Sequence, residues 1–199
     1  MRLPIFKLLL FFVVCLPTLG AAQTLLVFGD SLSAAYGIPR EKGWVALLQQ
    51  ARPDLQVINA SVGGETTAGG LRRLDAALRQ HRPDIVILEL GANDGLRGRP
   101  IAEIETDLAE LIRRSQRAKA KVMLLGMQLP PNYGVDYTGA FRQLYPTLAE
   151  RYHAARVPYL LEGVPPEQFQ ADNLHPTAAA QAQIMRNVLK ELRTPTATH

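Results

Sequence analysis

Five short, almost entirely apolar segments recur along the chain, and a segment of helical periodicity follows each one. The predicted strands span Thr24–Phe28, Gln56–Asn59, Asp84–Leu90, Lys121–Gly126 and Val157–Leu160. The predicted helices span Trp44–Gln50, Thr66–His81, Ile101–Lys119, Tyr137–Ala155 and Pro176–Leu192. Strands that are apolar on both faces are typical of a parallel sheet covered by helices on both sides. The sequence therefore predicts a three-layer α/β/α fold around a five-stranded parallel sheet, with right-handed crossovers.

The first 22 residues have the three-part layout of a secretory signal. Basic residues flank a short opening, the apolar run Leu8–Leu19 follows, and small residues end at Ala22. The run is too short to span a bilayer comfortably. We expect cleavage after Ala22, which makes residues 1–22 a signal peptide and residues 23–199 a single domain. An uncleaved amphipathic anchor is the alternative. The mature protein is then expected in the periplasm or secreted, without stable membrane insertion.

Charge and residue usage exclude several classes of partner. The formal net charge is +4, but the arginines are spread along the chain, which argues against a nucleic-acid partner. The only cysteine, Cys15, lies in the predicted signal, so the mature chain has no disulfide. His81 and His199 lack neighbouring ligand-type residues, as does His153, which is expected on a helix surface. We therefore expect a monomer with no metal and no cofactor.

In a parallel α/β sheet, functional groups lie just beyond the carboxyl ends of the strands. After the first predicted strand the chain reads Gly-Asp-Ser-Leu-Ser, which places Ser31 at the top of the sheet, although an ordinary turn has the same composition. After the second strand, Gly63 and Gly64 permit close approach of the backbone to a ligand. Capping of the next helix by Glu65 and Thr66 is the alternative there.

Two further segments carry polar side chains with possible chemical roles. Asn93 follows the third strand and can donate two N–H bonds without adding charge, which suits an oxyanion, although it could also be a turn asparagine. Asp172 and His175 lie on a short loop before the last predicted helix. The carboxylate can accept a hydrogen bond from Nδ1 of the imidazole, which leaves Nε2 free to face a nucleophile.

Taken together, these segments resemble the SGNH hydrolases, also called GDSL esterases, which are named for a Ser, a Gly, an Asn and a His in four separate blocks. The blocks here are Gly-Asp-Ser-Leu-Ser, Asn-Ala-Ser-Val-Gly-Gly-Glu, Gly-Ala-Asn-Asp-Gly and Asp-Asn-Leu-His-Pro. The chain is most similar to the branch of bacterial periplasmic enzymes with thioesterase, protease and lysophospholipase activities and their arylesterase relatives. It departs from that branch at Ala92, where a second Gly is expected.

The resemblance implies a flavodoxin-like fold and a triad of Ser31, Asp172 and His175. It also implies an oxyanion hole formed by Ser31, Gly64 and Asn93. Residues expected to contact the substrate are Asp94, Gly95, Leu96, Leu129, Pro130 and Tyr133. The implied reaction is hydrolysis of acyl esters and thioesters, such as aryl esters, acyl-CoA and lysophospholipids, through an acyl-enzyme. A carbohydrate O-deacetylase and a non-catalytic binding module are the alternatives. The Gly-x-Ser-x-Gly pattern of α/β-hydrolases is absent around Ser31.

Overall fold

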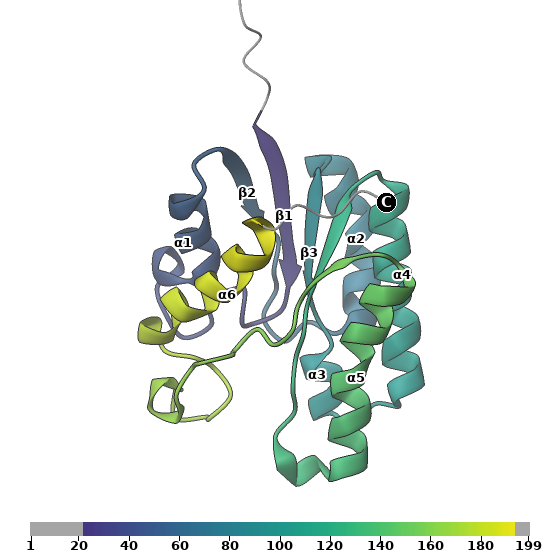
Figure 1. The fold of residues 1–199 in the computed structure, drawn as a ribbon, viewed down its shortest axis with the longest axis vertical. Coiled ribbons are helices and arrows are strands. Elements are labelled where there is room, and N and C mark those ends of the chain that lie inside the picture. Colours follow the sequence, from purple (N-terminus) through teal and green to yellow (C-terminus); the bar gives the residue numbers. More distant parts are fainter. Residues whose placement is uncertain (1–21, 194–199) are drawn as a thin grey trace, which may run out of the picture.

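The computed structural model describes residues 22–193 and contains a five-stranded parallel sheet (Figure 1). The strands are β1 (Gln23–Gly29), β2 (Leu55–Asn59), β3 (Ile85–Glu89), β4 (Lys121–Leu125) and β5 (Ala155–Val157). Their order across the sheet is β2-β1-β3-β4-β5, and every neighbouring pair is parallel. This is the order of flavodoxin-like sheets. The predicted fold class is therefore confirmed.

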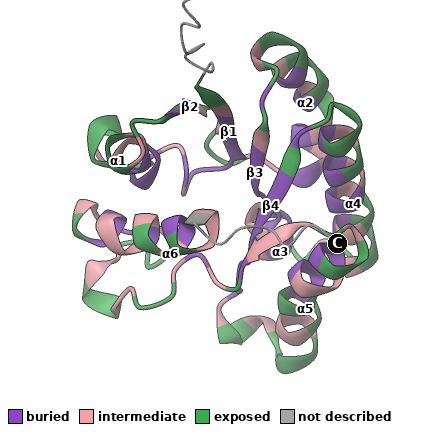
Figure 2. Cartoon of the chain, turned by 45° about the horizontal axis from the view of Figure 1, so that its top comes forward, coloured by how far each residue is buried: buried purple, intermediate pink, exposed green. Residues whose placement is uncertain are grey.

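Helices cover both faces of the sheet. They are α1 (Trp44–Ala51), α2 (Thr67–His81), α3 (Ala92–Leu96), α4 (Ile101–Arg117), α5 (Val135–Arg151) and α6 (Gln181–Arg193). Short 3-10 turns are η1 (Arg40–Lys42), η2 (Pro131–Tyr133), η3 (Pro166–Gln168) and η4 (Ala178–Ala180). Figures 1 and 2 show α1 and α6 packed together on one side of the sheet, whereas α2, α4 and α5 cover the other.

Burial of the apolar segments explains why the strands and helices form where they do. The β1 side chains from Leu25 to Phe28 are completely buried, as expected for a strand with a helical layer on each face. Ile104, Leu108, Leu111 and Ile112 follow one face of α4 and are buried against the sheet. In Figure 2 the buried colour accordingly concentrates on the strands and on the inner faces of the helices.

Three predicted positions are wrong, each for a local reason. The fifth strand spans Ala155–Val157 rather than Val157–Leu160, because Pro158 follows and has no N–H to donate. His153 does not lie on a helix surface; α5 ends at Arg151, and His153 has a left-handed φ of 50°. The last helix begins at Gln181 and not at Pro176, because Pro176 pairs with Phe169 in an antiparallel bridge.

The predicted signal peptide, residues 1–22, lies outside the described residues except for Ala22. Cys15 and His199 also lie outside them. Within residues 22–193, none of the helices combines the length and the apolar character that a membrane crossing requires.

Candidate active site

Ser31 lies in a tight turn directly after β1, at the carboxyl edge of the sheet. The N–H of Ala34 donates to the carbonyl of Asp30 at 3.0 Å, and the N–H of Tyr36 donates to the carbonyl of Ser31 at 3.1 Å. The side chain of Asp30 stabilises the same turn, because its Oδ1 accepts the N–H of Leu32 at 3.0 Å. Ser31 is only 9% exposed, and these hydrogen bonds define the turn that presents it at the strand end.

The loop before α6 holds Asp172 and His175 against each other. Oδ1 of Asp172 accepts the backbone N–H groups of Leu174 and His175, and Oδ2 lies 2.7 Å from Nδ1 of His175. These contacts, the two backbone hydrogen bonds first, lower the pKa of Asp172 to about 2. Asn173 between them has a left-handed φ of 56°, a conformation that asparagine tolerates better than most residues. The carboxylate therefore stays ionised and aligned with the imidazole.

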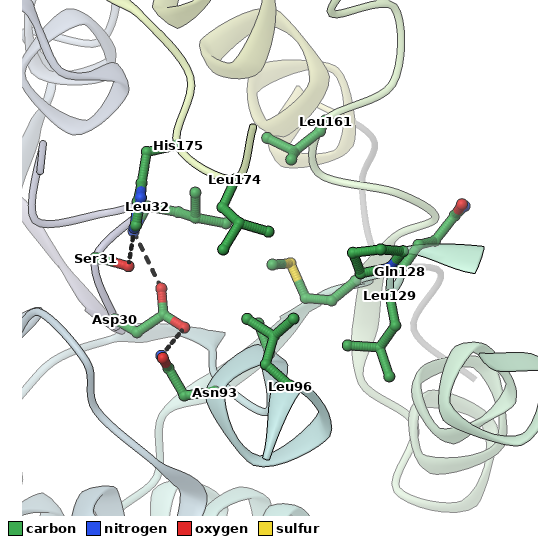
Figure 3. Close-up of a pocket in the computed structure, with 13 residues that line it drawn as sticks. Asp30, Ser31, Leu32, Asn93, Leu96, Gln128, Leu129, Leu161, Leu174 and His175 are labelled. Atoms are coloured by element: carbon green, nitrogen blue, oxygen red, sulfur yellow. Dashed lines mark hydrogen bonds between the residues drawn. The ribbon is translucent and has the colours of Figure 1, made fainter. Parts of the chain in front are cut away.

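The imidazole of His175 faces the nucleophile position. Its Nε2 lies 2.8 Å from Oγ of Ser31. A dashed line marks this contact in Figure 3. The ring of Tyr36, from the turn after Ser31, lies with its centroid 4.4 Å from the His175 ring and restricts its rotation. The structure thus brings together all three residues that the sequence predicts as a triad, in the order carboxylate, imidazole, hydroxyl.

Gln170 connects the serine turn to the histidine loop. Its Nε2 donates to the carbonyls of Tyr36 at 2.9 Å and Pro176 at 3.1 Å, and its backbone N–H donates to the carbonyl of His175 at 2.8 Å. One residue therefore contacts both the serine turn and the histidine loop of the candidate site. Gln170 was not among the predicted site residues, because nothing in its local sequence distinguishes it from a surface glutamine.

The residues predicted to bind an oxyanion lie beside Ser31. Asn93 is the second residue of α3, and its Nδ2 donates to Oδ2 of Asp30 at 2.9 Å and to the carbonyl of Glu65 at 3.0 Å. Both N–H groups of the amide are therefore engaged, so an oxyanion would have to replace one of these two acceptors. Gly64 lies in the adjoining loop with a left-handed φ of 72°, which glycine adopts without strain.

A cavity of about 120 Å³ opens beside Ser31 and His175 (Figure 3). Three of the predicted substrate-contacting residues line it: Leu96, Leu129 and Pro130. The other lining residues are Asp30, Ser31, Leu32, Ala92, Asn93, Met127, Gln128, Leu161, Leu174 and His175. Most of these side chains are apolar away from the catalytic groups, which is the composition of a site for an acyl chain. Ala92 contributes its methyl group to this wall.

Three predicted substrate contacts do not line this cavity. Asp94 is buried and accepts hydrogen bonds from Thr67 and Arg99. Gly95 is also buried, and a Cβ there would lie 2.8 Å from side-chain atoms of Leu129. The hydroxyl of Tyr133 donates to the carbonyl of Leu96 at 2.8 Å. These residues shape and support the cavity from behind instead of facing its interior.

Several lining residues were missed although the strand-end rule points to them. Met127 and Gln128 follow β4, while Leu161 follows β5. The sequence analysis expected functional groups beyond those ends but had no polar pattern there to select. Leu174 was not predicted to line the cavity, because only Asp172 and His175 of its loop were considered as site residues. Within residues 22–193, His, Cys, Asp and Glu side chains do not gather in groups of three that could hold a metal ion.

Comparison with known proteins agrees with this arrangement. The profile of the GDSL-like lipase/acylhydrolase family matches residues 27–183, which include every residue of the predicted triad. The chain belongs to this family. As a GDSL hydrolase it is an enzyme that acts on carboxylic esters, and the predicted resemblance is confirmed.

Relatives of known activity cover most of this GDSL hydrolase. It is 48% identical over 180 residues to Esterase TesA of Pseudomonas aeruginosa, covering 87% of this chain and 90% of that one. It is 40% identical over 177 residues to thioesterase 1/protease 1/lysophospholipase L1 of Escherichia coli K12, covering 87% and 85%. The crystal structure of esterase EstA from Pseudoalteromonas, inhibited by monoethylphosphonate, superposes with a TM-score of 0.83 at 41% identity, covering 86% and 97%.

Proposed function

We propose that this GDSL hydrolase cleaves acyl esters and thioesters through an acyl-enzyme on Ser31, with His175 as general base and Asp172 as its orienting carboxylate. One observation carries the proposal: Nε2 of His175 lies 2.8 Å from the Ser31 hydroxyl while Nδ1 lies 2.7 Å from Asp172. This geometry requires a proton on Nδ1, so that Nε2 is free to accept one. The ionised carboxylate of Asp172 can only accept a hydrogen bond, so it keeps the proton of the neutral imidazole on Nδ1.

The reaction proceeds in two acyl transfers. Oγ of Ser31 attacks the carbonyl carbon while its proton passes to Nε2 of His175. The imidazolium then protonates the departing alcohol or thiol as the ester or thioester bond breaks, which leaves the acyl group on Ser31. A water molecule gives its proton to His175 and attacks the acyl-enzyme. The carboxylic acid is released, and the proton returns to Ser31.

Negative charge on the carbonyl oxygen is stabilised by three donors in this proposal. They are the backbone N–H groups of Ser31 and Gly64 and the side-chain amide of Asn93. Two of them come from the ends of neighbouring strands, and Gly64 can present its N–H because it adopts a left-handed φ. Donors held in place before the reaction cost no reorganisation as charge develops, and this applies to the two backbone N–H groups. The Asn93 amide must exchange an acceptor. In the resting enzyme, Asp30 accepts the Asn93 hydrogen that the oxyanion would take.

The cavity beside Ser31 suggests the acyl group that binds best. At 120 Å³ it has the volume of about four liquid waters, counted at roughly 30 Å³ each. A short acyl chain would fill the cavity. A longer chain would extend beyond it, past the partly exposed Leu174, and its end would lie in solvent. The names of the relatives add aryl esters, thioesters and lysophospholipids as substrate classes. We therefore propose short to medium acyl esters and thioesters as preferred substrates.

Covalent labelling tests the nucleophile. A fluorescent organophosphonate should label the wild type and fail to label Ser31→Ala, with the label mapping to Ser31 in the digested protein. Ser33→Ala and Ser61→Ala are the controls for other nucleophiles, because neither serine lines the cavity. Ser61→Ala is the one expected to label at the wild-type rate, since the Ser33 hydroxyl also donates to Glu89. Labelling that persists in Ser31→Ala and disappears in either control would transfer the role to that serine. A wild type that resists the reagent would favour the non-catalytic binding module.

A chain-length series tests the substrate class. Nitrophenyl esters and acyl-CoA thioesters from two to sixteen carbons should show a maximum of kcat/KM at short to medium length. Leu129→Trp should shift that maximum toward shorter chains, because the larger ring fills the cavity. Equal rates at all lengths would reject the cavity as the acyl site. Preference for acetylated sugars over these esters would favour the O-deacetylase alternative.

We also propose export through residues 1–22, on the layout of basic, apolar and small residues in that segment. Expression of the full chain in a bacterium, followed by N-terminal sequencing of the protein in the periplasm and the medium, tests this. A mature protein that starts at Gln23 supports cleavage after Ala22. Retention of the protein at full length in the membrane fraction would support the anchor instead.

A further inference from the structure

A carboxyl group is buried beneath the serine turn and has no role in the chemistry described so far. Glu89 ends β3, pairs in register with Gly29 of β1, and is 0% exposed. Its Oε2 accepts the backbone N–H of Asp30 at 3.1 Å and the hydroxyl of Ser33 at 2.8 Å. A Cβ on Gly29 would lie 2.6 Å from Oε2, so glycine at that position makes room for the carboxyl group.

The other oxygen of Glu89 has no donor. Oε1 is buried and accepts no hydrogen bond from the part of the chain that the structure describes. The nearby cation, Arg73 of α2, is directed elsewhere: its guanidinium contacts Glu65 and the carbonyls of Ala60 and Gly29. A buried carboxylate without a cation and with one unpartnered oxygen is expensive. Protonation of Oε1 removes the charge and converts the unpartnered atom into a donor.

An acceptor for that proton is available in Asp30. The two residues are in direct contact, because Oε2 of Glu89 accepts the backbone N–H of Asp30 at 3.1 Å, and both side chains are buried. Oδ1 of Asp30 accepts the N–H of Leu32, and Oδ2 accepts the amide of Asn93. Asp30 therefore has the donors that stabilise an anion, whereas Glu89 has a free position for a proton. These contacts place the charge on Asp30 and the proton on Glu89.

Burial agrees with this division. Burial, with the charge of Asp30 second, raises the pKa of Glu89 well above its ordinary value. Burial also raises the pKa of Asp30, to about 6, with the N–H of Leu32 opposing the shift. Around neutral pH the pair then holds a single proton and a single negative charge.

We propose that Glu89 is a protonated positioning residue, whose carboxylic acid donates to the Asp30 carboxylate, which in turn orients the Asn93 amide at the edge of the catalytic centre. This inference rests on the proposed role of Asn93 in binding the oxyanion. Asp30 lines the cavity and Glu89 lies behind it, so Glu89 acts only through its neighbour.

The proton on Glu89 limits the negative charge next to the developing oxyanion. A second charge on this pair would repel the oxyanion and would hold the Asn93 amide more tightly on Asp30. The other titratable or charged groups around the pair are His175 from the last loop, Arg73 from α2, Asp94 from α3 and Tyr145 from α5. Burial raises the pKa of Tyr145 well above its ordinary value, so this phenol stays neutral.

Glutamine at position 89 tests the protonation state. The side chain of Glu89→Gln reproduces a protonated glutamic acid: its oxygen accepts from Asp30 N–H and Ser33, and its amide N–H donates to the Asp30 carboxylate. We expect kcat within about threefold of the wild type at pH 7, and no loss at the alkaline pH where the wild type declines. Glu89→Met, which cannot donate, should lower kcat at least tenfold while KM changes little. If kcat is retained in Glu89→Gln but falls in Glu89→Met, the side chain acts through the hydrogen bond that it donates and not only by filling space.

A readout that does not depend on activity completes the test. Infrared spectroscopy at pH 7 should show the C=O stretch of a protonated carboxylic acid in the wild type and in Glu110→Gln, whose side chain is paired with arginines at the surface. The band should disappear in Glu89→Gln. A wild type without the band, or a folded Glu89→Gln with kcat reduced more than tenfold, would overturn the inference. If organophosphonate fails to label Ser31, the proposed function fails, but the infrared result still decides where the proton lies.

Discussion

Nε2 of His175 lies 2.8 Å from Oγ of Ser31, although 144 residues separate them along the chain. The contact depends on elements at the two ends of the domain. Ser31 follows the first strand, and His175 precedes the last helix, which packs on α1. Gln170 and Tyr36 connect the two loops directly. The catalytic geometry is thus a property of the whole domain rather than of any one motif.

Asp172→Asn should lower kcat by roughly a hundredfold to ten-thousandfold with little change in KM. The amide oxygen can still accept the N–H groups of Leu174 and His175, so the loop should keep its shape. The amide N–H beside Nδ1 would instead favour the tautomer with its proton on Nε2, which cannot accept the Ser31 proton. Steady-state kinetics and circular dichroism check this. Unchanged kcat in a folded variant would show that Asp172 does not set the tautomer.

Asn93→Ala should lower kcat by about a hundredfold or more, equivalent to roughly 3 kcal/mol of barrier, because one oxyanion donor is lost. The rate of organophosphonate labelling should fall in parallel, since that reaction also develops charge on an oxygen. KM for a short ester should change little. Near-full turnover by a folded Asn93→Ala enzyme would instead limit Asn93 to holding Asp30 and the Glu65 carbonyl.

Gln170→Ala should weaken the connection between the serine turn and the histidine loop. Two side-chain hydrogen bonds are lost, to the carbonyls of Tyr36 and Pro176, which corresponds to about 1–2 kcal/mol of unfolding free energy. We expect kcat to fall several-fold as well, because His175 is less well held. Urea denaturation and kinetics measure the two effects. Gln143→Ala, at an exposed position on α5, is the control and should change neither.

Arg99→Met should destabilise the fold more than other surface arginine variants. Nη1 of Arg99 binds Asp94, Asp107 and Thr67, and the Asp94 side chain is fully buried. Removal of the cation leaves that carboxylate uncompensated, at a cost of roughly 2–4 kcal/mol. Urea denaturation checks the value. Arg113→Met, which loses one pair on the exposed side of α4, should change stability by less than about 1 kcal/mol.

The buried acid pair predicts how stability depends on pH. A group whose folded pKa is raised binds more protons in the folded state, so its contribution is lost as pH rises from its unfolded value toward the raised one. For Glu89 this loss begins near its ordinary pKa of 4.5, and for Asp30 it runs from 3.8 to about 6. Above pH 4.5, Glu89→Gln should therefore gain on the wild type by about 1.4 kcal/mol for each pH unit, until Glu89 ionises in the folded protein. A constant difference across pH would contradict the raised pKa.

The parts of the fold that depend on periodicity could be predicted from the sequence. The five apolar segments and their intervening helices follow directly from burial on two faces, and four of the five strands lie close to their predicted bounds. The fifth was shifted because the predicted boundary ignored Pro158, which cannot continue a ladder of N–H donors. The start of α6 depends on the bridge between Phe169 and Pro176, a tertiary contact that no local pattern encodes.

The candidate site divides in the same way. Ser31, Asn93 and His175 lie at strand ends or beside a helix start, where polar residues stand out in the sequence. Asp94 and Tyr133 lie in the same segments, yet their side chains turn toward Arg99 and the Leu96 carbonyl, and only packing decides that direction. Glu89 could not be predicted as a functional residue, because it does not lie in a polar segment. Glu89 lies inside a predicted strand. An acidic residue in a mostly apolar segment gives no indication that its carboxyl group is buried and, as proposed, protonated.

The serine turn lies near the start of the domain and the histidine loop lies near its end. This separation has a consequence for biosynthesis. A ribosome-bound chain that has not yet extruded its final loop has the serine but lacks the imidazole, and it cannot hydrolyse an ester. A chain truncated just before α6 keeps His175, but it loses the helix that follows the histidine loop and packs on α1. The proposed serine–histidine pair is therefore assembled only when both ends of the domain are present and folded together.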